Sequence, residues 1–267
     1  MSLFRFYKNN FFYLIPSILF FISLISITEV FADSSLYDRG RAYYYGDGVE
    51  QDYGKALLAF EQGAKVGDLD ALTALGIMYI VGVGVNNDNE KGLEYLNSAA
   101  NKTHPKAQYY LGAMYYLGIG VSIDYNKAYS WINLAAKQGY IFAEHNLAQM
   151  YETGKGVEVN LKKAYEYYIS SARKGYLESQ IKVAEMYKNG IGTKKDLVKS
   201  SYWLNKIEES EFETVEYEDY EDDPLRFIFS SIQEFTDYDD DIKILELYDS
   251  IKPELTYTIA EYESKWR

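Results

Sequence analysis

The sequence predicts an all-α repeat protein, and three observations support this. A glycine recurs every 36 residues, at Gly48, Gly84, Gly120, Gly156 and Gly192. A second glycine stands two residues before each of these, and a tyrosine stands three residues before that second glycine. Apolar side chains between the glycine pairs recur at helical spacing, as at Ala107, Leu111 and Met114. Five copies of one unit at a constant period indicate a repeat architecture.

Each copy is predicted to contain a helix A, a glycine turn and a helix B. In the third copy helix A is expected from Pro105 to Leu117, because proline suits the first helical position. The glycine pair would end this helix, since glycine adopts a positive φ without a steric clash. Helix B would begin at an N-cap side chain, which is Asp52, Asp88, Asp124, Asn160 or Asp196. A lysine follows three residues later in every copy, and it does not fit a capping box.

One position inside helix A holds only small residues. It is occupied by Gly40, Gly76, Gly112, Ala148 and Ala184 in the five copies. Glycine within a helix costs about 1 kcal/mol relative to alanine. We therefore predict that helix B crosses helix A too closely at this position for a larger side chain.

These motifs resemble the Sel-one-like repeat, a relative of the tetratricopeptide repeat. The third copy shows them as Leu111-Gly112, Met114-Tyr115, Gly118 to Val121 and Asp124 to Ala128. The resemblance implies a right-handed α-solenoid of five helix-turn-helix repeats, with C-terminal helices as a cap. It also implies a scaffold that binds proteins, which in bacteria is often exported. Unit two departs from the pattern at Gly92 and Thr103.

The chain is predicted to have four parts. Residues 1–32 have the layout of a signal peptide, with basic residues, a charge-free apolar run over 11–27, and small residues at Val30 and Ala32. An uncleaved membrane anchor is the alternative, because 17 residues lie at the lower edge of spanning length. Residues 33–208 would form the repeats, 209–224 an acidic linker and 225–267 a C-terminal helical region. The expected location is periplasmic or secreted, with no integral span after cleavage.

Composition argues against several classes of function. The formal net charge is −13, so a nucleic-acid backbone would be repelled. There is no cysteine, which excludes disulfides, cysteine–zinc sites and thiol nucleophiles. The two histidines, His104 and His145, lie in different copies without ligand spacing around them. We expect no metal and no cofactor.

An enzyme of the β-lactamase or penicillin-binding type is the alternative function, because some relatives with these repeats carry the β-lactamase label. The Ser-x-x-Lys motif occurs as Ser171 with Lys174 and as Ser179 with Lys182. Neither pair is accompanied by the Ser-Asp-Asn and Lys-Thr-Gly elements of such a site. A module associated with the cell wall is a further alternative. The sequence favours a scaffold that is not an enzyme.

The expected binding surface is the side of the A helices opposite their core positions, which lines the concave face of a helical-pair solenoid. This row changes in character from copy to copy, as expected where each copy contacts a different part of one ligand. The predicted protein-binding residues are Thr73, Ile77, Ile80, Tyr109, Ala113, Tyr116, His145, Gln149, Glu152, Ile181, Glu185 and Lys188. Exposed tyrosine and isoleucine clusters mark interaction surfaces, so a protein or peptide is expected to dock across the second and third copies. The oligomeric state is left open.

Overall fold

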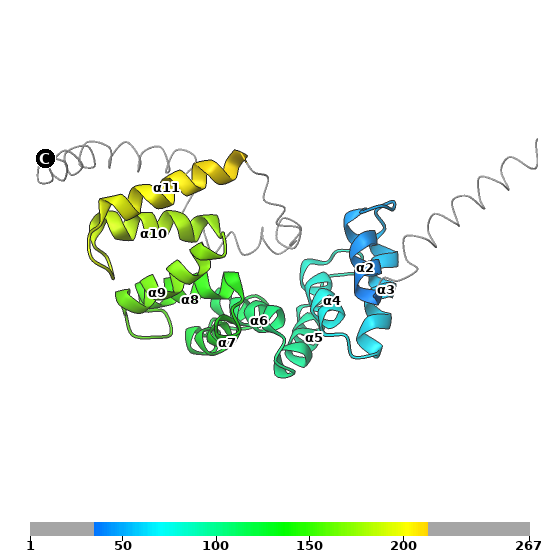
Figure 1. The fold of residues 1–267 in the computed structure, drawn as a ribbon. Coiled ribbons are helices and arrows are strands. Elements are labelled where there is room, and N and C mark those ends of the chain that lie inside the picture. Colours follow the sequence, from blue (N-terminus) through cyan, green and yellow to red (C-terminus); the bar gives the residue numbers. More distant parts are fainter. Residues whose placement is uncertain (1–34, 213–267) are drawn as a thin grey trace, which may run out of the picture. The chain divides into compact units, whose positions relative to one another are not determined.

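The computed structural model describes residues 35–212, which contain ten α-helices and no strand (Figure 1). The helices are α2 (Leu36–Tyr45), α3 (Tyr53–Lys65), α4 (Leu69–Val81), α5 (Asn89–Asn101), α6 (Pro105–Leu117), α7 (Tyr125–Lys137), α8 (Ile141–Thr153), α9 (Leu161–Arg173), α10 (Leu177–Asn189) and α11 (Leu197–Phe212). Each copy thus supplies one helix A and one helix B, as predicted. The predicted signal peptide and C-terminal helical region lie outside the described residues.

Two boundaries along the chain are visible in the structure. Helix α11 continues to Phe212, so the first residues of the expected acidic linker are helical. The chain also divides into two compact units, with the boundary between Asn87 and Asp88. The described part of the first unit holds α2 to α4, and that of the second holds α5 to α11. No helix among residues 35–212 is long and apolar enough to cross a membrane.

Within the second unit, each helix packs against its neighbours in the chain, as α10 and α11 do in Figure 1. The A helices of successive copies also contact one another there. The Asn146 side chain of α8 donates to the Tyr109 hydroxyl of α6 at 3.3 Å. On the other side of α8, His145 Nδ1 lies 2.8 Å from the Ser179 hydroxyl of α10. These contacts place α6, α8 and α10 in one row.

The turn between helix A and helix B repeats one set of contacts, seen here in the third copy. Gly118 has a φ of 76°, and its N–H donates to the Met114 carbonyl at 2.8 Å. Asp124 donates its N–H to the Tyr115 carbonyl at 2.9 Å and accepts from the Lys127 N–H at 3.0 Å. The Lys127 ammonium lies 5.1 Å from the centre of the Tyr115 ring and 3.6 Å from the Asp124 carboxylate. The recurring lysine therefore joins the end of helix A to the start of helix B.

The close crossing predicted at Gly112 is present. A Cβ built on Gly112 would lie 2.6 Å from Cγ1 of Ile132, 3.1 Å from its backbone nitrogen and 3.2 Å from the Ala128 carbonyl. Two of these neighbours are backbone atoms of α7, which cannot move aside as a flexible side chain can. A side chain at Gly112 would therefore press on α7, as the close crossing requires.

The second glycine of each pair has a role that sequence reasoning missed. A Cβ on Gly156 would overlap the carbonyl oxygen of Tyr125, and one on Gly192 would overlap that of Leu161. Tyr125 and Leu161 are the first helical residues of helix B in the preceding copy. This glycine therefore lets the turn of one copy touch helix B of the copy before it.

Candidate functional site

The predicted binding row is only partly exposed. Seven of its twelve residues are buried, and these are Thr73, Ile77, Ile80, Tyr109, Ala113, His145 and Ile181. The expectation that Ile77, Ile80 and Tyr109 stand in water is therefore wrong. Because they are packed, there is no exposed apolar cluster across the second and third copies to support a binding surface there.

Tyr109 shows why an aromatic residue of this row is buried. Its ring centre lies 5.4 Å from that of Tyr110, 5.3 Å from Tyr140 and 6.1 Å from Phe142. Its hydroxyl accepts from Asn146, so the side chain fills the space between α6 and α8. The spacing within one helix A identifies the side opposite its core, but it does not show that the next helix A covers much of that side.

His145 is buried in the same way, beside Ser179 of the next helix A. Burial, together with the positive charge of Lys182, lowers the pKa of His145 from 6.5 to about 3. The imidazole is therefore neutral at physiological pH. It also packs edge-on against the Tyr168 and Tyr176 rings, with centres 5.3 Å and 4.9 Å away.

The five remaining residues of the row are half-exposed, and these are Tyr116, Gln149, Glu152, Glu185 and Lys188. Tyr116 packs edge-on against Tyr125, and the Lys155 ammonium lies 4.9 Å from its ring centre. Hydrogen bonding to Tyr116 raises the pKa of Lys155, so this cation stays charged. These five residues are the accessible part of the predicted surface.

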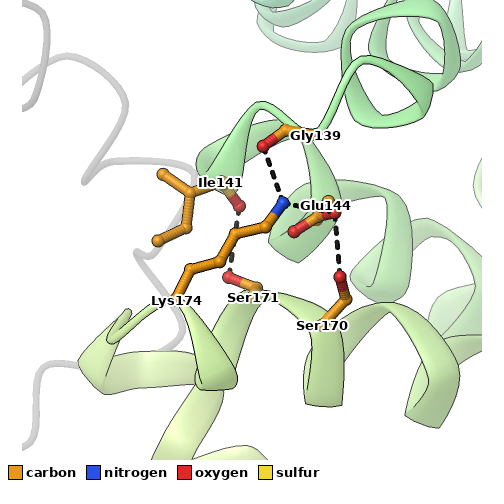
Figure 2. Close-up of polar contacts among 6 residues, drawn as sticks. All are labelled: Gly139, Ile141, Glu144, Ser170, Ser171 and Lys174. Atoms are coloured by element: carbon orange, nitrogen blue, oxygen red, sulfur yellow. Dashed lines mark hydrogen bonds and ion pairs between the residues drawn. The ribbon is translucent and has the colours of Figure 1, made fainter.

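Neither Ser-x-x-Lys pair has the arrangement of an acylating serine and its base. Ser171 is fully buried, and its hydroxyl donates to the Ile141 carbonyl at 3.2 Å. The Lys174 ammonium instead donates to Glu144 and to the Gly139 carbonyl, both at 2.7 Å (Figure 2). In the other pair, Ser179 is buried beside His145 and the Lys182 ammonium lies 3.6 Å from Glu185.

Glu144 is the centre of a polar cluster that the sequence did not single out. It lies on α8 and its side chain is only 7% exposed. Its Oε1 accepts from the Ser170 hydroxyl at 2.9 Å and from the Lys174 ammonium at 2.7 Å, as Figure 2 shows. Its Oε2 is buried and has no hydrogen-bond partner in the described part of the chain. A buried carboxylate oxygen in this state is rare and needs an explanation.

Two other copies have a neutral side chain at the position of Glu144, and its contacts there can be compared. Gln108 and Gln180 occupy it in the third and fifth copies, and their amides donate to the Ala100 and Ala172 carbonyls at 3.2 Å. Gln138, which corresponds to Lys174, donates to Gln108 at 2.8 Å. A neutral pair in one copy is thus an ion pair in the next. This change between copies is the sequence signal that identifies the cluster.

A cleft adjoins this cluster between the two helices of the fourth copy. Its volume is about 320 Å³, and it is lined by Glu144, Tyr151, Lys163, Glu166, Tyr167 and Ser170. The Tyr151 and Tyr167 rings are nearly parallel, with an angle of 6° and centres 6.0 Å apart. The Lys163 ammonium lies 5.0 Å from the centre of the Tyr151 ring.

No metal centre is found among the described residues. Residues 35–212 contain no group of three or more histidine, aspartate or glutamate side chains arranged to hold an ion. His104 serves as an N-cap, with its Nδ1 accepting from the Ala107 N–H at 3.4 Å.

Comparison with known proteins places the chain among repeat proteins. Residues 33–68, 69–104, 105–140, 141–176 and 177–209 match the family model described as Sel1 repeat. A Sel1 repeat protein from Oxalobacter formigenes is 28% identical, with a TM-score of 0.58, over 66% of this chain and 70% of that one. A protective antigen of uropathogenic Escherichia coli, which displays an SLR fold, is 30% identical with a TM-score of 0.61. That match covers 82% of this chain and 45% of the antigen, so this chain spans less than half of the antigen's length. The search of curated proteins found no match.

Proposed function

Because the chain belongs to the Sel1 repeat family, we propose that it is a protein-binding scaffold without catalytic activity that is exported to the periplasm or beyond. The partner is a protein or peptide, and it docks on the concave face formed by the A helices. The expected signal peptide over residues 1–32 supports export. The repeats supply a rigid framework on which surface residues are free to vary.

The observation that carries this proposal is the contrast between core and surface positions of the A helices. The crossing position is glycine or alanine in every copy, whereas the accessible positions change completely. Tyr116 in the third copy, Gln149 and Glu152 in the fourth, and Glu185 and Lys188 in the fifth are half-exposed. Variation that leaves the packing untouched is expected where each copy contacts a different part of one partner.

Because seven of the twelve predicted residues are buried, the proposed surface is limited to the third, fourth and fifth copies. Within it, Glu152 is not free to change, because it accepts from the buried Tyr168 hydroxyl at 2.7 Å. Burial first, and then the charge of Glu152, raise the pKa of Tyr168 well above 10.0. Tyr116 and Gln149 are better positions to test, since the Tyr168 hydroxyl donates to Glu152 and not to them.

The test is the double variant Tyr116→Ala with Gln149→Ala in the mature chain. The variant and the wild type are each immobilised and exposed to envelope extract, and the retained proteins are quantified. We expect the partners bound specifically by the wild type to fall at least tenfold. The matched control is Ser130→Ala with Lys137→Ala, on the exposed face of α7, which should retain them.

A loss of partners in the control, with full retention in the first variant, would show that the A-helix surface is the wrong one. Retention of cell-wall material in place of any protein would contradict the scaffold proposal itself. Circular dichroism confirms beforehand that both variants are folded.

A further inference from the structure

The cleft between α8 and α9 lies apart from the five accessible residues of the A-helix row. At about 320 Å³ it reaches the lower end of the range of small-ligand pockets. Its lining holds the carboxylates of Glu144 and Glu166 and the ammonium of Lys163. Lys174 pairs with Glu144 at 2.7 Å, and Lys162 lies 4.0 Å from Glu166. The lining is therefore charged and partly aromatic.

Glu144, which lines this cleft, holds an acceptor that no group among the described residues satisfies. The residue is 5% exposed, and both of its hydrogen bonds end on Oε1. The other oxygen is buried and has no donor among residues 35–212. A carboxylate only accepts hydrogen bonds, so a partner for this oxygen must be a donor. In the third copy, by contrast, the Gln108 amide both donates and accepts.

The aromatic lining indicates what kind of donor fits. The nearly parallel Tyr151 and Tyr167 rings line the cleft together with Glu144. A cation already lies over one of them, because the Lys163 ammonium is 5.0 Å from the centre of the Tyr151 ring. An arginine guanidinium is planar, stacks on aromatic faces and donates to carboxylates through a rigid set of N–H groups. Arginine is also enriched at the centres of protein interfaces.

We propose that the α8–α9 cleft binds an arginine side chain of a protein partner, with the guanidinium on the tyrosine faces and an N–H donating to Glu144 Oε2. Because this oxygen is closed to solvent, a lining side chain must move for the contact to form. Lys163 is exposed and long, and the guanidinium takes over its place above the Tyr151 ring. The inference rests on the proposed function only in taking the partner to be a protein.

The test uses an isolated arginine group, so that its failure leaves the scaffold proposal standing. N-acetylargininamide is titrated into the mature protein, and binding is followed by NMR. We expect saturable shifts of α8 and α9 resonances with a millimolar Kd. N-acetylcitrullinamide, which is nearly the same shape but neutral, should bind at least tenfold more weakly.

The decisive variant is Glu144→Gln, because glutamine stands at this position in two other copies and the fold accommodates it. The amide keeps an acceptor for Ser170 and Lys174 but replaces the free acceptor with a donor. Affinity for N-acetylargininamide should fall at least tenfold, and Glu158→Gln, which removes an exposed charge elsewhere, should leave it unchanged. Tyr167→Leu should weaken binding, whereas Tyr167→Trp, the residue type of Trp131 in the third copy, should retain it.

Four results would overturn the proposal. One is the absence of saturable shifts at 50 mM N-acetylargininamide, a concentration about tenfold above the Kd expected for weak millimolar binding. Another is equal binding of the arginine and citrulline compounds. The third is undiminished affinity in a folded Glu144→Gln protein. Equal affinity for N-acetyllysinamide would reject arginine as the preferred group.

Discussion

At the scale of single residues, Glu144 shows how one copy of a repeat departs from its neighbours. Gln108 uses both ends of its amide and Gln180 donates to the Ala172 carbonyl, whereas Oε2 of Glu144 has no donor among the described residues. A buried acceptor without a partner costs about 1–3 kcal/mol. Such a cost is typical of positions kept for function.

The first prediction follows from this comparison. Glu144→Gln should raise the free energy of unfolding by about 1 kcal/mol, because the amide can donate to the Ala136 carbonyl as its counterparts do. Lys174 loses its anion, but its side chain is 39% exposed, so that loss is small. Urea denaturation measures the change, and Glu158→Gln is the control. A loss of stability of more than about 1 kcal/mol would contradict the account.

The second prediction concerns pH and His145. Its folded pKa, about 3, lies below its ordinary value of 6.5, so the unfolded chain binds more protons between these values. Stability from this residue is fully present above pH 6.5 and is lost as pH falls toward 3. Between pH 7 and pH 4.5 the loss should be on the order of 2 kcal/mol.

His145→Gln tests that assignment, because glutamine does not titrate and can still bond to Ser179. Denaturation midpoints are compared for both proteins across this pH range. The variant should show a flatter curve between pH 6.5 and 4.5. Parallel curves would mean that the carboxylates, which both proteins share, account for the acid sensitivity.

At the scale of elements, the glycines have three separate structural roles, which the sequence alone does not distinguish. Gly118 ends a helix through its positive φ, Gly112 lets α7 cross α6, and Gly156 lets one copy touch the copy before it. The first depends on backbone conformation, and the other two depend on neighbouring atoms.

The third prediction compares a tight crossing with an exposed contact. Gly112→Leu should destabilise the protein by roughly 2 kcal/mol or more relative to Lys127→Ala, because overpacking typically costs 1–3 kcal/mol. Lys127→Ala removes only an exposed ion pair and a cation–π contact, each of which contributes up to about 1 kcal/mol to stability. Denaturant midpoints measure both variants. Similar midpoints would refute the close-crossing account.

The fourth prediction separates steric contact from positive φ. Gly156 and Gly67 have φ values of 73° and 86°, but a Cβ on Gly67 meets no atom within 4 Å. Gly67→Ala should therefore lower the free energy of unfolding only by the cost of a positive φ in a residue with a Cβ, about 1 kcal/mol. Alanine at Gly156 should cost at least about 1 kcal/mol more, because it displaces the Tyr125 carbonyl. Equal losses in thermal or urea unfolding would assign the whole effect to φ.

At the scale of the whole molecule, a repeat protein is stabilised by contacts within each copy and with the next copy. The described contacts of the second unit follow this rule, since its helices pack on their neighbours in the chain. Such a framework leaves surface positions free, and both proposed binding sites use positions where the copies differ.

The fifth prediction concerns export of the full chain. When the precursor is expressed with its native N-terminus in a bacterial host, the exported protein should begin near Asp33, after the small residues Val30 and Ala32. Cell fractionation followed by N-terminal sequencing measures this. An intact N-terminus in the membrane fraction would favour the anchored alternative.

The sequence by itself determined the helix pairs, their turns and the close crossing at Gly112. These features depend on contacts repeated in every copy, so five versions of the same signal reinforce one another. The period does not reveal which positions of one copy the next copy covers. That is why Tyr109 and His145 were expected at the surface and are buried against adjacent A helices.

The tertiary structure alone decided the state of Glu144 and the cleft beside it. Glu144 lies on α8, Tyr167 lies on α9 and Lys174 is the C-cap of α9. The Glu144–Lys174 contact spans 30 residues of sequence. A local pattern cannot show that a carboxylate has one oxygen bound and the other without a donor. Hydrogen bonding and burial are settled by the packing of α9 on α8, where helix A and helix B of one copy meet.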